Sequence, residues 1–144
     1  MLEMPGYLLD TNVLSEIRKG PLRAQATVYQ WWLSMHNQEL FLSVMTLGEI
    51  RKGIDWLAHR DAPQALVLEQ WLAKVKHAFR DRLLEITPSI AECWGRLQAS
   101  RALPEVDALL AASVLTLDLT LVTRNEADFD NLGIRVLNPF QSAG

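Results

Sequence analysis

The sequence predicts a three-layer α/β/α domain around a central parallel sheet of about four to five strands. Short apolar runs alternate along the chain with longer segments whose apolar residues recur every three or four positions, as on one face of a helix. The first run, Tyr7-Leu8-Leu9, is apolar throughout, which is typical of a strand that helices cover on both faces. With 144 residues, 49% of them hydrophobic, the chain suits a single domain over residues 1–144.

Strands and helices are expected in alternation. The strands are expected at 7–9, 40–43, 83–86, 120–123 and 134–137. The helices are expected at 13–19, 24–35, 46–60, 63–79, 88–102 and 105–117. Their apolar stripes are Val13, Leu14 and Ile17; Val28, Trp31, Trp32 and Met35; Ile50, Ile54 and Leu57; Leu66, Trp71, Leu72, Val75 and Phe79; Trp94 and Leu97; and Leu110, Ala111 and Val114.

Proline and glycine mark where these elements begin and end. Gly20-Pro21 ends the first helix, Pro88 begins the fifth, and Pro104 separates the last two. In a parallel sheet, ligands collect beyond the carboxyl ends of the strands. The functional site is therefore expected at that edge.

Several classes of protein are excluded by what the sequence lacks. The single Cys93 makes neither an internal disulfide nor a zinc site, which indicates a reducing compartment. Glu3 stands where a signal peptide would be basic, and no long apolar segment occurs, so a cytoplasmic protein without membrane contact is expected. The histidines, serines and glycines show no zinc, acyl-transfer or nucleotide-loop spacing.

Three acids lie next to predicted strand ends or open predicted helices, and each has a simpler structural interpretation. Asp10 follows the first strand and would serve as a helix N-cap. Asp107 would complement a helix dipole, yet it shares the stripe of Leu110 and Ala111 that should face the sheet. Glu49 would be a solvated helix residue.

The combination of these positions is more informative than any one of them. The segment from Thr123 through Asn125 to Asp128 lies near the end of the fourth strand, although Asn and Asp are also ordinary turn residues. The fold would gather Asp10, Glu49 and Asp107 with this segment at one rim of the sheet. Clustered carboxylates repel one another unless cations lie between them, and oxygen ligands without His or Cys favour Mg²⁺ or Mn²⁺.

The formal net charge of −3 does not suggest a protein that binds nucleic acid through basic surface alone. Removing the four negative charges of the candidate site leaves +1 for the rest of the chain. Arg51, Lys52 and Arg124 lie close in sequence to the acids and are candidates for contacting an RNA backbone, although solvated surface residues are commoner.

Trp31 and Trp32 are adjacent, so they cannot both face inward on one helix. One of the two is therefore a candidate for a protein interface. Such an interface would suit a homodimer.

Four blocks of the sequence together resemble the PIN domain family, and within it the VapC and FitB branch. The blocks are LLDTNVLSE at 8–16, TLGEIRKGI at 46–54, DALLAA at 107–112, and LVTRN at 121–125 with Asp128-Phe129 and LNPF at 137–140. The resemblance implies a Mg²⁺-dependent endoribonuclease, the toxin of a type II toxin-antitoxin pair. It also implies a dimer and a small antitoxin that inserts a segment into the acidic pocket.

The resemblance assigns roles to particular residues. Its metal-binding acids match Asp10, Glu49 and Asp107, and Thr11, Asn12 and Thr123 would be supporting polar groups. Many relatives carry an aspartate where this chain has Asn125, and the nearest acid here is Asp128. Asp128 is taken as the fourth catalytic and metal-binding acid with Asn125 in support, and mechanisms with one or two metal ions both remain open.

Other functions compete with this interpretation. A phosphohydrolase of the haloacid dehalogenase type needs a second Asp two residues after the first, where this chain has Asn12, and a receiver domain lacks its acidic pair for a similar reason. A non-catalytic binding module would use the acidic pocket only to dock a basic partner segment. The sequence does not indicate which RNA would be cut.

Overall fold

A computed structural model describes residues 6–141, so the outermost residues of the predicted domain, 1–5 and 142–144, lie outside the described part. The strands are β1 (Tyr7–Leu9), β2 (Leu40–Ser43), β3 (Leu83–Leu84), β4 (Thr120–Val122) and β5 (Arg135–Leu137). The α-helices are α1 (Thr11–Arg18), α2 (Ala26–Ser34), α3 (Val44–Ala58), α4 (Ala62–Ala78), α5 (Pro88–Ser100) and α6 (Glu105–Leu117). Two short 3₁₀ turns, η1 (Asn37–Glu39) and η2 (Glu126–Phe129), complete the described elements.

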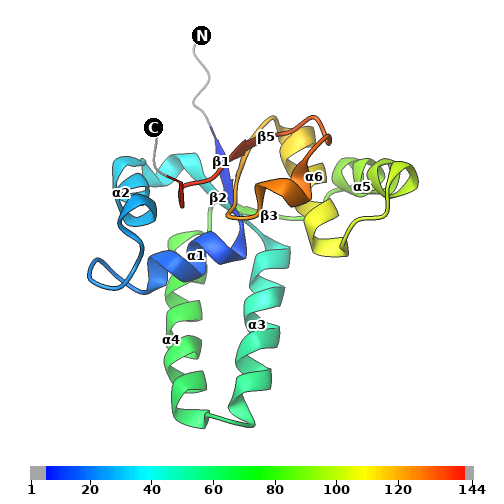
Figure 1. The fold of residues 1–144 in the computed structure, drawn as a ribbon. Helices are drawn as coiled ribbons and strands as arrows, with labels where there is room; N and C mark the ends of the chain where they lie inside the picture. The colour runs from blue at the N-terminus through cyan, green and yellow to red at the C-terminus, as the bar shows by residue number, and fades with distance from the viewer. Residues whose placement is uncertain (1–5, 142–144) are drawn as a thin grey trace.

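The strands form one parallel sheet in the order β3-β2-β1-β4-β5. The chain builds outward from β1 to β2 and β3, then crosses to the other side of β1 for β4 and β5. The strand order therefore reverses between β1 and β4, the place where open parallel sheets usually form a crevice for ligands. Figure 1 shows β1 near the centre of the molecule.

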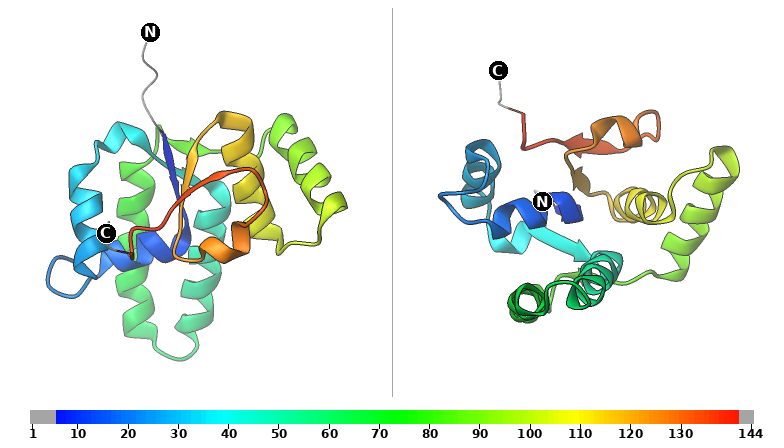
Figure 2. Two further views of the ribbon diagram at one scale, coloured as in Figure 1. Left: turned by 45° about the horizontal axis from the view of Figure 1, so that its top comes forward. Right: turned by 60° about the horizontal axis from the view of Figure 1, so that its bottom comes forward.

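Helices pack on both faces of the sheet, so the predicted three-layer architecture is confirmed (Figure 2). Successive strand residues point to opposite faces. Leu9 and Val122 lie in a core with residues of α1 to α4, whereas Leu8 and Leu121 lie in a second core with residues of α6. The central strand β1 is apolar throughout and buried at Leu8 and Leu9, whereas β5 at the sheet edge begins with the exposed Arg135.

The long helices α3 and α4 extend together from one end of the sheet as an antiparallel pair (Figure 1). Ser43 begins α3 by accepting a hydrogen bond from the Met45 N–H, and Asp61 begins α4 by accepting one from the Gln64 N–H. Glu49 lies in the second turn of α3, close to the end of β2. Among residues 6–141, no helix combines the length and apolar character needed to cross a lipid bilayer.

Trp31 and Trp32 are both half-buried and both pack against the core that α1 to α4 share. Trp31 makes an edge contact with Tyr7, and Trp32 makes one with Tyr29. The expectation that one of the two faces away from the core is wrong, because α2 lies across the edge of that core and presents two adjacent sides to it. A homodimer interface at either residue stays a prediction.

Candidate acidic active site

Asp10 lies at the carboxyl end of β1 and is the N-cap of α1. Its Oδ1 accepts a hydrogen bond of 2.7 Å from the Thr11 N–H, and its Oδ2 accepts bonds of 2.8 Å from the Thr123 hydroxyl and 3.2 Å from Asn12 Nδ2. Only 8% of the residue is exposed. Asp10 therefore caps a helix, as its structural interpretation predicts, while its carboxylate also binds Thr123 directly after β4.

Thr123 and Asn12 connect the ends of β1 and β4. The Thr123 oxygen accepts hydrogen bonds from Asn12 Nδ2 at 3.4 Å and from the Asn125 N–H at 3.1 Å while its own proton goes to Asp10. Asn12 Oδ1 accepts a bond of 3.2 Å from the Arg124 N–H. These contacts fix the orientation of the Asp10 carboxylate.

Glu49 reaches the same edge from α3. Its Oε1 accepts a hydrogen bond of 2.6 Å from the Thr11 hydroxyl, which follows Asp10 directly in the chain. Thr11 donates one hydrogen bond from its N–H to Asp10 and one from its hydroxyl to Glu49, so it links the two carboxylates. Glu49 itself is exposed, so its other oxygen is open to solvent.

Asp107 lies in the first turn of α6, half-buried at the edge of the sheet. Burial raises the pKa of its carboxyl above the ordinary value, and the negative charges of Asp10, Asp128 and Glu49 raise it further. Burial also raises the pKa of Asp10, against the opposing hydrogen bonds from Thr123, Thr11 and Asn12, and the charge of Asp128 adds to the rise. Asp107 therefore lies within electrostatic range of the other three predicted acids, and Asp10 lies within range of Asp128.

Asp128 is exposed on η2, in the loop that follows β4. Its N–H donates to the Asn125 carbonyl at 3.1 Å, and Arg101 at the end of α5 donates to the carbonyls of Asp128 at 3.3 Å and Asp130 at 2.8 Å. Asn125 is also exposed, and the structure gives its side chain no hydrogen bond among the described residues. The loop places both residues beside the other acids but leaves open which one would complete a metal site.

Asn138 is a supporting residue that the sequence did not single out. It follows β5, and its Nδ2 donates to the Arg124 carbonyl and to the Glu126 carboxylate, both at 3.2 Å, while its Oδ1 accepts from the Phe140 N–H at 2.9 Å. Asn12 holds the N–H of Arg124 and Asn138 holds its carbonyl, so the loop is fixed from two sides. The signal was present, since Asn138 is a polar residue directly after a strand, like Asp10 and Thr123.

The carboxylate and amide oxygens at this edge are the type of ligand that a hard cation such as Mg²⁺ binds. Within residues 6–141 no three His, Cys, Asp or Glu side chains stand close enough to hold a metal ion as they are placed. Mg²⁺ does not need such a cage, because it is usually bound through one or two carboxylates and keeps several waters. The three hydrogen bonds to Asp10 leave acceptor capacity on a carboxylate that has about four lone-pair sites.

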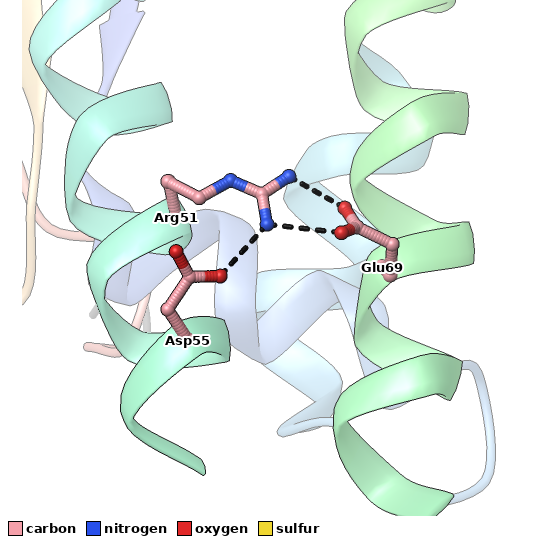
Figure 3. Close-up of polar contacts among 3 residues, drawn as sticks. All are labelled: Arg51, Asp55 and Glu69. Atoms are coloured by element: carbon pink, nitrogen blue, oxygen red, sulfur yellow. Dashed lines mark hydrogen bonds and ion pairs between the residues drawn. The ribbon is translucent and has the colours of Figure 1, made fainter. Parts of the chain in front are cut away.

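The three basic residues predicted to contact RNA have different surroundings. Arg51 forms a two-pronged ion pair with Glu69 of α4, with a shortest distance of 2.6 Å, and contacts Asp55 at 3.0 Å (Figure 3). Its guanidinium therefore already serves to join α3 to α4. Lys52 is exposed, and the Arg124 guanidinium lies over the Phe140 ring at 4.8 Å. RNA contact by any of the three stays a prediction.

Three curated proteins are similar to this chain over almost its full length. It is 30% identical to a plasmid stability protein, StbB, of Pseudomonas syringae pv. tomato, a match that covers 94% of this chain and 99% of that protein. It is 28% identical to the toxin FitB of Neisseria gonorrhoeae (92% and 97% covered). It is 27% identical to the VapC ribonuclease Y4jK of Sinorhizobium fredii (94% and 99% covered).

Solved structures and a family model agree with these relatives. The structure of FitAcB from Neisseria gonorrhoeae matches with a TM-score of 0.84 at 25% identity, over 94% of this chain and 99% of that one. A chain of a toxin-antitoxin complex from Klebsiella pneumoniae shares the fold with a TM-score of 0.65 at 24% identity, over 95% and 100%. The family model described as PIN domain matches residues 7–134. This chain therefore belongs to the PIN domain family.

Proposed function

We propose that this chain is a metal-dependent endoribonuclease and the toxin of a type II toxin-antitoxin module. One observation carries the proposal: Thr11 joins Asp10 to Glu49 beyond the end of β1, and burial together with the charges of Asp10, Asp128 and Glu49 disfavours ionisation of Asp107. Such a cluster is unfavourable unless a cation joins it. The relatives described as a toxin and as a ribonuclease support the same function.

Asp10, Glu49 and Asp107 would hold Mg²⁺, with Mn²⁺ as an alternative, and Asp128 or Asn125 would complete the site. When bound, the ion acidifies an attacking water and neutralises charge on the scissile phosphate. The chain's own part is to orient the carboxylates. Thr123 and Asn12 orient Asp10, and Thr11 orients Glu49. Because water would be the nucleophile, no side-chain nucleophile is needed.

A cognate antitoxin would neutralise the site by presenting a basic segment to it. The grouped carboxylates of the site offer charge complementarity to such a segment. The similarity to toxin FitB supports this partner. We also propose that the chain forms a homodimer, which light scattering on the purified protein would measure.

The test is cleavage of a total RNA pool by purified chain that has been freed of any partner. Discrete fragments are expected with Mg²⁺, and none with EDTA or in the Asp10→Asn variant. The matched control is Asp81→Asn, because Asp81 is an exposed acid outside the site. The control should cleave like the parent.

Two results would contradict the proposal. Undiminished cleavage by Asp10→Asn would remove Asp10 from the site. A folded chain that cleaves no RNA with any divalent ion, yet binds a basic peptide equally well before and after Asp10→Asn, would favour the non-catalytic binding module.

A further inference from the structure

An open groove of about 640 Å³ is lined by Glu49 but by none of the other three acids. Residues of α3 form most of it, and Val106 of α6 closes one side. Trp56 lies in this groove and is 57% exposed. Glu49 and Trp56 are seven positions apart on one helix, so they are about 10 Å apart along its axis. The groove therefore continues outward from a candidate catalytic acid to an exposed indole.

Cations line this path. The Arg60 guanidinium lies over the Trp56 ring at 3.8 Å from its centroid, and Lys52 lines the groove between Glu49 and Trp56. The other cation on this part of α3, Arg51, points away toward α4 (Figure 3). Aromatic rings with neighbouring cations are typical of surfaces that bind unpaired nucleic acid strands.

The floor of the groove is open because α3 carries glycine there. A Cβ atom at Gly48 or Gly53 would meet no atom within 4 Å. Gly53 also borders a second groove of about 270 Å³ on the other side of α3, which Thr11, Arg18 and Trp71 line. There the Arg18 guanidinium lies 5.7 Å from the Trp71 ring centroid, so the tryptophan of each groove has an arginine beside its ring.

We propose that an unpaired stretch of the RNA substrate crosses α3 over Gly53, with one base stacked on Trp56 and its phosphate beside Lys52. This inference rests on the proposed ribonuclease function and adds the residues that position the strand. The charges select this occupant over a basic peptide. Lys52, Arg60 and Arg18 attract phosphate and repel a cationic segment, whereas the nearby acid, Glu49, belongs to the catalytic cluster.

The first experiment measures binding without cleavage. In the Asp10→Asn background, the anisotropy of a short fluorescein-labelled single-stranded RNA of random sequence reports affinity. Trp56→Ala should weaken binding by about five- to 150-fold, which corresponds to the loss of one stacked base, and Trp56→Phe should restore most of it. Lys52→Met should lower the slope of log affinity against log salt by about 0.7.

The second experiment blocks the path without disturbing the fold. Side chains of increasing size at Gly53, in the series Gly53→Ala and Gly53→Gln, have free space around Cβ and should leave the melting temperature equal or higher. RNA affinity should fall as the side chain grows. Gly95→Gln is the matched control, because Gly95 lies in α5, lines neither groove, and likewise leaves a Cβ atom free of contacts within 4 Å.

Cleavage kinetics complete the test. In the otherwise unchanged chain, Trp56→Ala should raise KM and leave kcat within about twofold, since stacking outside the reacting atoms contributes uniform binding. RNA affinity that is unchanged by both Trp56→Ala and Gly53→Gln, in a chain that cleaves RNA, would overturn the inference and leave the function intact. Loss of antitoxin binding alone in Gly53→Gln would likewise overturn it, in favour of a peptide. A chain that neither binds nor cleaves RNA would overturn both.

Discussion

Asp10 and Asp107 have raised pKa values for partly different reasons. Asp10 is buried, and three hydrogen bonds to its carboxylate offset much of the cost of ionisation. Asp107 is only half-buried, and the charges of three neighbouring acids disfavour its ionisation in addition to burial. Hydrogen bonds thus orient the Asp10 carboxylate and partly offset its burial, whereas no hydrogen bond within the described part of the chain offsets the burial and repulsion that raise the pKa of Asp107.

Asp107→Asn should stabilise the metal-free protein at neutral pH. The folded-state pKa of Asp107 lies above its ordinary value of 3.8, so the folded state binds more protons between those two values. The destabilisation that ionised Asp107 causes is therefore absent below pH 3.8 and complete above the raised pKa. The expected gain is small, at most about 3 °C in Tm, because solvent screens a half-exposed group.

Thermal melts in EDTA across a pH series measure this effect, with Asp81→Asn as the control for loss of a charge at the surface. The advantage of Asp107→Asn should shrink as the pH falls toward 3.8. A variant that is less stable than the parent at neutral pH would show that the first-turn position of Asp107 on α6 outweighs repulsion.

At the scale of the elements, the five strands and six α-helices found within residues 6–141 could be predicted from apolar spacing and from proline and glycine. The prediction for the last helix, 105–117, matches α6, and the strand at 40–43 matches β2. The third strand is shorter than expected, since only Leu83–Leu84 pair with β2. The turns η1 and η2 were not predicted, because pieces this short have no periodicity to detect.

The grouping of the acids could be predicted because parallel strands end at the same edge. The contacts that orient them could not. The Thr11 hydroxyl meets Glu49 38 positions away, and Arg101 holds the η2 loop through backbone carbonyls, which no sequence pattern marks. Neither the strand order nor the pairing of Arg51 with Glu69 follows from spacing, since both depend on how separate helices pack.

Asn138→Ala should loosen the β4–η2 loop without unpairing β5. The variant loses two donated hydrogen bonds to the loop and one accepted from Phe140, whereas the backbone bond from the Thr123 N–H to the Leu137 carbonyl remains. Each of the two bonds to the loop is worth about 1 kcal/mol, so amides at 124–129 should exchange about 30-fold faster. Hydrogen-deuterium exchange measures this, and kcat should fall with it because Asp128 lies on this loop.

Asn138→Asp separates the donated from the accepted bonds. The aspartate keeps an acceptor for the Phe140 N–H but faces the Arg124 carbonyl and the Glu126 carboxylate without a donor. It should therefore loosen the loop at least as much as alanine does. Normal hydrogen exchange and normal kcat in Asn138→Asp would mean that the important contact of Asn138 is the bond it accepts from the Phe140 N–H, and not its bonds to the loop.

In the molecule as a whole, the acidity is concentrated and the rest of the chain is nearly neutral. The formal net charge is −3, and without Asp10, Glu49, Asp107 and Asp128 it is +1. The fold brings Asp107 within reach of the other three charges, and both grooves reach Glu49, one lined by Lys52 and the other by Arg18. An anionic polymer would thus meet cations beside the acids, and under the proposed function a metal ion would lie among them.

A cation that joins these charges should stabilise the entire fold, since anything that binds only the folded state shifts unfolding by mass action. At a Mg²⁺ concentration of about 100 times its Kd the gain is about 2.7 kcal/mol, or about 5 to 10 °C in Tm for a chain of this size. Screening also relieves repulsion among the acids, so the reference is NaCl of equal ionic strength. Calorimetric melts should show the shift in the parent and a smaller one in Asp107→Asn. Equal shifts in Mg²⁺ and NaCl would mean that the four carboxylates hold no ion and repel one another only as surface charges.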